Sequence, residues 1–271
     1  MIRLILFILT LCLTTAALSN PQGTYQTLLR TKSCSDPFWS KVVLLMPFEG
    51  TNGSTGSPGV DDFSPSAHGT ATSGASSTIE TAQFQFGTSS YRMHTSVGNS
   101  LVYNDSPDWT LSSANSDQFT VEGWVRYNSL GTTRSVLSQY TFSGTGNNSW
   151  QLWNQSSSTE FDFIFSPDGT ATTSISTSGA SLSTGTWIPW AVDKDSGGKI
   201  RIYVNGVMKG SSTPANSAFF NSTNGLGILS VAPIGNRLDG WIDELRITKG
   251  VARYANDGGY TVTTQAFPIC N

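Results

Sequence analysis

The most informative part of the sequence is Gly240-Trp241-Ile242-Asp243-Glu244-Leu245-Arg246-Ile247-Thr248-Lys249-Gly250-Val251-Ala252-Arg253-Tyr254. Successive side chains of a β-strand point to opposite faces. One face of this stretch is therefore expected to hold Trp241, Asp243, Leu245 and Ile247, and the other Ile242, Glu244, Arg246 and Thr248. The first face is apolar apart from Asp243. Burying an unpaired carboxylate is costly, so we expect Asp243 to be matched by a metal, a cation or several backbone N–H groups.

The beginning of the chain has the pattern of a secretory leader. Met1-Ile2-Arg3 is followed by an apolar run from Leu4 to Leu13 and then by small and polar residues. This pattern predicts a signal peptide over residues 1–19, with an uncleaved anchor as the alternative. Residues 20–40 are expected to form a lead-in, and residues 41–271 a single large domain. The sequence thus predicts an exported, secreted or surface-associated protein.

Composition excludes some partners. Only 12% of the residues are charged, and the formal net charge is −3. Lysine and arginine occur singly, so the chain has no nucleic-acid-binding footprint. Low charge together with many aromatic residues is typical of an extracellular β-protein.

Two cysteines remain after the predicted leader, Cys34 and Cys270, near the two ends of the mature chain. In an exported protein such a pair is expected to form a disulfide. Closing so long a loop stabilises a fold by roughly 5 kcal/mol in the chain-entropy model.

The domain consists of short apolar runs separated by Gly, Ser, Thr and Asn clusters, and no stretch shows a useful helical period. This texture predicts an all-β, antiparallel β-sandwich or jelly roll. The predicted strands are Val42–Phe48, Tyr91–His94, Ser100–Tyr103, Phe119–Tyr127, Arg134–Tyr140, Trp150–Trp153, Phe161–Phe165, Trp187–Val192, Lys199–Val204, Leu226–Ser230 and Gly240–Thr248. Asn205-Gly206 predicts a hairpin turn after the strand that ends at Val204.

Several of these segments, in order, resemble the laminin G-like, concanavalin A-like domains of phage and bacterial surface proteins. The segments are Val42–Gly50, Asp62-Phe63-Ser64, His68-Gly69-Thr70, Phe86–Tyr91, Phe119–Val125, Ser183–Trp187, Ile202–Gly206 and the closing string from Gly240. The resemblance implies a concanavalin A-like jelly roll that binds and does not catalyse. Two positions depart from the family pattern, Glu49 in place of Asp and Pro189 in place of His.

Three carboxylates are candidates for a cation site: Glu49, Asp62 and Asp243. In a sandwich of this type the first and last strands are commonly neighbours, so Glu49 and Asp243 are expected to converge. Calcium prefers carboxylate and carbonyl oxygens, and the resemblance implies a structural calcium ion near such positions. The alternative is that Asp243 accepts backbone N–H groups and that Glu244 pairs with an arginine at the surface.

Aromatic residues beside polar loops are candidates for ligand contact. They are Tyr140, Trp150, Trp153, Phe219 and Phe220, with Asn154 as a hydrogen-bonding partner. Flat aromatic faces stack on sugars and also serve protein contacts. The alternative is that they pack in the core, as we expect for Trp124, Trp187 and Trp190.

Catalysis is not favoured. The chain lacks the paired acids of glucanases on one strand, and it has no motif of a serine hydrolase or zinc protease,. Two functions stay open: a binding module for surface glycans or a protein partner in adhesion or host recognition, and a structural or assembly protein of a virion, filament or matrix. A diverged glycoside hydrolase is a third reading and needs two carboxylates in one cleft.

Overall fold

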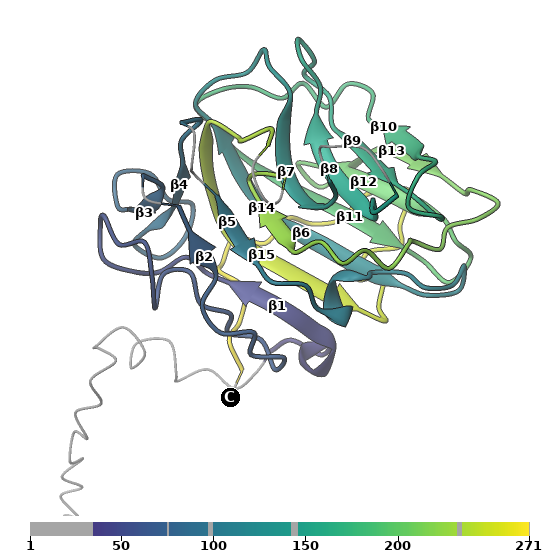
Figure 1. Ribbon diagram of the computed structural model, residues 1–271, viewed down its shortest axis with the longest axis horizontal. Helices are drawn as coiled ribbons and strands as arrows, with labels where there is room; N and C mark the ends of the chain where they lie inside the picture. The colour runs from purple at the N-terminus through teal and green to yellow at the C-terminus, as the bar shows by residue number, and fades with distance from the viewer. Residues whose placement is uncertain (1–34, 75, 97–99, 142–145, 232–234, 271) are drawn as a thin grey trace, which may run out of the picture.

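The computed structural model describes residues 35–74, 76–96, 100–141, 146–231 and 235–270. Two antiparallel sheets face each other across one large apolar core, as the two layers in Figure 1 show. This arrangement confirms the predicted all-β sandwich. The signal peptide predicted at 1–19 and the lead-in up to residue 34 lie outside the described residues.

The eight-stranded sheet contains, in chain order, β1 (Val42–Met46), β3 (Thr78–Glu80), β4 (Ser90–Met93), β6 (Phe119–Tyr127), β11 (Trp187–Lys194), β12 (Ile200–Val204), β13 (Val207–Ser212) and β15 (Gly240–Lys249). Its spatial order is β13-β12-β11-β6-β15-β4-β3, and β1 pairs with the second half of β15. The first and last strands are therefore neighbours, as predicted from the sequence, and Figure 1 shows purple β1 beside yellow β15.

The seven-stranded sheet contains β2 (Thr72–Ser73), β5 (Leu101–Tyr103), β7 (Arg134–Gln139), β8 (Trp150–Asn154), β9 (Asp162–Phe165), β10 (Thr173–Ser176) and β14 (Leu226–Ile228). Its spatial order is β10-β9-β8-β7-β14-β5-β2. Two single-turn 3-10 helices accompany the strands, η1 (Trp39–Lys41) before β1 and η2 (Pro107–Trp109) after β5.

A β-bulge in the middle of β15 corrects the face assignment made from the sequence. The register with β6 shifts between Asp243 and Arg246, and Glu244 has a positive φ of 53°. An extra residue in one strand reverses the alternation beyond it. The core-facing residues are therefore Ile242, Leu245 and Ile247, whereas Asp243 lies on the outer face, opposite Trp124 of β6.

The chain that follows β15 covers part of the outer face of the eight-stranded sheet, around Trp124 and Tyr203. Trp124 packs against Phe86 and Phe267, with ring centroids 5.0 and 5.2 Å apart, in a second apolar cluster. Tyr254 stacks on Tyr260 at 3.7 Å.

Candidate functional site

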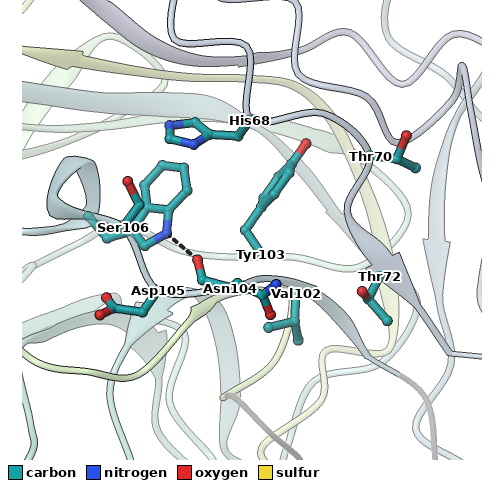
Figure 2. Close-up of a pocket in the computed structure, with 9 residues that line it drawn as sticks. His68, Thr70, Thr72, Val102, Tyr103, Asn104, Asp105 and Ser106 are labelled. Carbon is teal, nitrogen blue, oxygen red and sulfur yellow. Dashed lines mark hydrogen bonds between the residues drawn. The ribbon is translucent and has the colours of Figure 1, made fainter.

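A polar pocket lies at the edge of the seven-stranded sheet, beside β2 and β5. It has a volume of about 140 Å³, and its lining residues are His68, Thr70, Thr72, Val102, Tyr103, Asn104, Asp105, Ser106 and Trp109. Figure 2 shows these side chains arriving from the loop before β2, from β2 itself, from β5 and from the loop after β5. The pocket is smaller than the roughly 300–1,000 Å³ of sites for drug-sized molecules. It therefore suits one small polar group or one end of a longer ligand.

The wall of the pocket is aromatic. The Trp109 ring lies 4.4 Å from the His68 ring and 5.8 Å from the Tyr103 ring, between centroids. The Trp109 indole donates a 2.8 Å hydrogen bond to the carbonyl of Asn104, drawn as the dashed line in Figure 2. The turn that carries Trp109 is capped by Ser106, whose hydroxyl accepts from the N–H of Asp108. Local chain geometry thus fixes the wall before any ligand arrives.

Asp62 builds the loop that brings His68 to the pocket. Its carboxylate accepts hydrogen bonds from the N–H groups of Leu45, Ser64 and His68 and from the Ser64 hydroxyl, at 2.8–3.0 Å. A buried carboxylate with several such donors is well satisfied. The sequence identified Asp62 as a metal ligand, and the structure shows it as an organiser of this loop.

Tyr103 is a hydrogen-bond donor in the pocket wall. Its hydroxyl donates to the carbonyl of Gly69 at 3.1 Å and contacts that of Val60 at 3.2 Å. Burial, and then the charges of Asp62 and Asp61, raise the pKa of this phenol far above its ordinary value. The phenol therefore stays protonated and acts as a fixed part of the wall.

Ser106, His68 and Asp108 are the residue types of a hydrolase triad, but their geometry differs from one. His68 Nε2 lies 3.1 Å from Asp108 Oδ2, and Lys249 Nζ lies 4.0 Å from Asp108 Oδ1. In the described chain the Ser106 hydroxyl caps η2 and makes no hydrogen bond to His68. A nucleophile must lie within reach of its base. The arrangement is a hydrogen-bonding wall with no activated serine.

A row of positions on the outer side of the sheet runs from the pocket to β10, with its middle buried and only its end residues Thr72 and Ser174 exposed. Strand register aligns Thr72, Val102, Gly227, Ser138, Gln151, Ile164 and Ser174 from β2 to β10. The alternate positions, such as Leu137, Leu152 and Phe163, belong to the core.

Three polar atoms on this outer face are enclosed without a hydrogen-bond partner: Gln151 Nε2, Trp153 Nε1 and Ser135 Oγ. Trp153 pairs with Ser135 in the neighbouring strand, so these groups lie together on β7 and β8. An unsatisfied buried polar group costs about 1–3 kcal/mol. Such groups call for a partner from outside the chain, either water or a ligand.

Three residues predicted to contact a ligand are instead buried. Trp150 is fully enclosed, and its indole donates to the carbonyl of Trp109 at 2.8 Å, which supports the pocket wall from behind. Phe219 stacks on Phe165 at 4.7 Å in the core. Asn154 is also fully buried, and its amide donates to the carbonyl of Gln155. These three predictions are corrected, because apolar packing explains the aromatic rings.

The other three predicted contact residues, Tyr140, Trp153 and Phe220, are half-buried, and none of them lines the pocket. Trp153 lies on the outer face of β8, beside the unpartnered Gln151 and Ser135 groups. Of the predicted set it is the residue best placed to meet a ligand on the sheet. The sequence predicted no binding role for the pocket residues Thr72, Asn104 and Asp105, of which Asn104 stands only in an Asn-x-Ser glycosylation pattern.

Asp243 and Glu49 hold the same loop from two sides. Asp243 Oδ2 accepts from the N–H groups of Gln85 and Phe86 at 2.7 and 3.0 Å, and Glu49 accepts from the N–H and hydroxyl of Thr88. Asp243 Oδ1 is enclosed and has no partner. Burial raises the pKa of Asp243 to about 8, although the two hydrogen bonds from Phe86 and Gln85 lower it. The negative charge of Glu49 raises this pKa further.

The three predicted metal ligands are not brought together. Across the described residues, no group of three or more Asp, Glu, His or Cys side chains is placed to hold a metal ion. The N–H groups expected as the alternative partners of Asp243 are present. Glu244 does not pair at the surface: it is 1% exposed and accepts from the N–H of Phe267. Burial, and then the charge of Asp243, raise the pKa of Glu244.

Cys270 is buried at the end of the described chain. Its predicted partner Cys34 lies outside the described residues, so the disulfide stays a prediction. Within the described segments, no helix has the length and apolar character needed to cross a bilayer.

The model of a protein family described as the concanavalin A-like lectin/glucanases superfamily, Laminin_G_3, matches residues 98–253. The chain belongs to this superfamily. The match covers more than half of the chain, including β6, the pocket turn η2 and the whole of the closing strand β15. It confirms the family resemblance found in the sequence. No curated protein matches the chain.

Solved structures with the same fold include binding domains of clostridial toxins. The botulinum neurotoxin serotype G binding domain is 18% identical, with a TM-score of 0.56, over 80% of this chain and 49% of that one. The binding domain of Paraclostridial Mosquitocidal Protein 1 is 14% identical, with a TM-score of 0.59, over 81% and 51%. The botulinum neurotoxin DC binding domain in complex with SialylT is 13% identical, with a TM-score of 0.54, over 81% and 50%. This superfamily member thus spans about half the length of these structures, and at such identity the likeness shows the fold alone.

Proposed function

We propose that the chain is an exported, non-enzymatic, lectin-like module that recognises a glycan. The observation that supports it is the polar pocket itself, which sets a carboxylate, an amide and hydroxyl groups beside an aromatic wall. One end of a saccharide, rich in hydroxyl groups, suits such a pocket. The leader pattern in residues 1–19 supports export.

The chemistry of the pocket favours hydroxyl recognition. Asp105 supplies a carboxylate, Asn104 an amide, and Thr70 and Thr72 hydroxyl groups, around an aromatic wall. Hydrogen bonds to a carboxylate are about twice as strong as neutral ones. Asp105 Oδ1 already receives a 3.3 Å hydrogen bond from Gln139, which orients it. We assign to Asp105 the central contact to a sugar hydroxyl.

The titles of two neighbours with this fold concern glycans. One describes cell entry of botulinum neurotoxin type C as dependent on two ganglioside molecules, and another describes a complex with SialylT. These statements belong to those proteins, whose chains are about twice as long as the region matched here. They make gangliosides and other sialylated glycans a reasonable first panel for this chain.

A glycan array followed by calorimetry tests the proposal. We expect binding by the wild-type protein and a loss of about tenfold in affinity for the double variant Asn104→Ala/Thr72→Val, because each lost hydrogen bond contributes about 0.5–1.5 kcal/mol. Thr264→Val, at an exposed position after the eight-stranded sheet, is the matched control and should bind as the wild type does. A silent array from a protein that is oligomeric in solution would instead favour the structural or assembly role.

We also propose a structural calcium ion at Asp243 and Glu49. Its support is the enclosed Asp243 Oδ1 without a partner, next to a second carboxylate whose charge raises the pKa of Asp243. Calcium takes six to eight oxygens, several of them backbone carbonyls, so two carboxylates are compatible with a site. Bound there, the ion would supply the positive charge that this pair lacks.

A further inference from the structure

Arginine and tryptophan alternate in one row on the outer face of the eight-stranded sheet. Strand register places Arg92 of β4 opposite Trp241 of β15, Trp241 opposite Arg126 of β6, and Arg126 opposite Trp187 of β11. The guanidinium carbon of Arg92 lies 4.3 Å from the centroid of the Trp241 ring, and that of Arg126 lies 5.5 Å from it. Directly opposed side chains in a sheet are close enough to interact. The row therefore places two guanidinium groups and two indoles in register on one face of the sheet.

The two arginines differ in their partners. Arg92 is buried and donates to Asp239 at 2.7 Å and to the carbonyl of Gly240 at 3.0 Å. Arg126 is half-buried, forms no ion pair with any described residue, and has an enclosed Nε without a hydrogen-bond partner. The Trp241 indole has only a donor N–H, which it gives to Glu80 at 2.5 Å, so it offers Arg126 no hydrogen-bond acceptor,. Arg126 is thus a positively charged side chain whose charge and Nε–H donor have no partner among the described residues.

The surroundings of Arg126 leave it open to a ligand. Residues 183–186, which precede β11, are exposed and include three hydroxyl-bearing side chains. Gly185 in this loop has a φ of 77°, and a Cβ built there would lie 3.7 Å from Arg126 Nη1. A Cβ there would only be in ordinary van der Waals contact with this nitrogen, so the loop lies directly beside the guanidinium. Trp187 and Trp241, both half-buried, flank the same spot with apolar surface.

We propose that Arg126 binds the carboxylate or sulfate of an acidic sugar residue, so that this row forms a second glycan contact on the sheet opposite the pocket. A guanidinium presents a planar fork of donors that matches a carboxylate or sulfate in bidentate fashion. The hydroxyls of residues 183–186 would hydrogen-bond the sugar, and the two indoles would contact its C–H surface. The site goes beyond the pocket, because it uses other strands and requires a charged ligand.

An NMR titration tests the proposal. Glucuronic acid or glucose 6-sulfate is added to the protein, and the ¹⁵N–¹H signal of the Arg126 Nε–H group is monitored. We expect both acidic sugars to shift this signal to saturation, and glucose not to shift it. Arg126→Gln should weaken binding of both by about tenfold or more, since charged hydrogen bonds contribute about 1.5–3 kcal/mol. Arg126→Lys should retain part of the affinity, because the charge remains and the fork is lost.

Lys209→Gln is the matched control, since it removes one positive charge from half-buried β13 on the same sheet, and it should bind as the wild type does. An unchanged affinity in Arg126→Gln, or an Arg126 signal that does not move, would overturn the proposal. So would inorganic sulfate binding as tightly as glucose 6-sulfate, because the sugar would then play no part. Loss of neutral-glycan binding in the pocket variant, with glucuronate binding intact, would show that the two sites are separate.

Discussion

At the scale of single residues, Asp243 shows what a pattern of residue types can and cannot predict. The sequence indicated that this carboxylate needed partners, and the structure supplies the N–H groups of Gln85 and Phe86. Those donors lie about 157 positions away in the chain, so no local pattern could name them. The predicted face was wrong because the bulge at Glu244 falls between Asp243 and Leu245, and nothing in their residue types indicates it.

Asp243 also provides the test of the calcium proposal. In metal-free buffer, added calcium should raise the melting temperature of the wild type by about 5–10 °C, since a ligand at 100 times its Kd stabilises by about 2.7 kcal/mol. Asp243→Asn should show no such rise, because a neutral amide binds calcium poorly. Asp257→Asn, in which the altered carboxylate is largely exposed and paired with Lys199, should retain the full rise. If neither calcium nor EDTA changes the melting temperature of the wild type, the calcium proposal is wrong.

At the scale of the elements, long strands were predictable and short polar ones were not. Period-two alternation identified β6, β11, β12 and β15. It missed β2 and β3, which have two and three residues, and β10, whose Thr-Ser-Ile-Ser sequence has only one buried side chain. Such strands exist because neighbouring strands provide hydrogen-bonding partners, which is a tertiary effect. The pocket was missed with them, because β2 forms part of its wall.

The segment after β15 is a second element that the sequence left undefined. Within it, Phe267 packs 5.2 Å from Trp124, and the Arg246 guanidinium lies 3.8 Å from the Phe267 ring. Phe267→Ala should therefore lower the free energy of unfolding by about 3–5 kcal/mol, as for other buried phenylalanines. Phe84→Ala, at a ring that is 43% exposed, should change it by less than about 0.5 kcal/mol,. Equal effects of the two variants in urea denaturation would show that the segment does not stabilise the sheet.

At the scale of the whole molecule, the order of the family segments predicted the architecture better than it predicted the site. The closing string forms the long strand β15. It pairs with β1, β4 and β6, so that the last strand of the sequence lies beside the first. Fold depends on such repeated pairings, whereas the pocket depends on loop residues such as Asn104 and Asp105. Loops vary most among proteins that share a fold. Their role can be read only once the strands have placed them.

The same closure makes the predicted disulfide a property of the whole chain. Trp39, just before β1, and Ile269, next to Cys270, both pack against the apolar cluster around Trp124, so the two ends of the described chain meet there. A bond from Cys34 to Cys270 would fasten the covering segment at the point where it ends. Reduction should then lower the free energy of unfolding by up to roughly 5 kcal/mol. A Cys270→Ser variant should start at the lower stability and be insensitive to reductant, and peptide mapping of the unreduced exported protein should recover the linked pair. Two freely alkylated thiols in that protein would refute the bond and leave packing alone to hold the ends together.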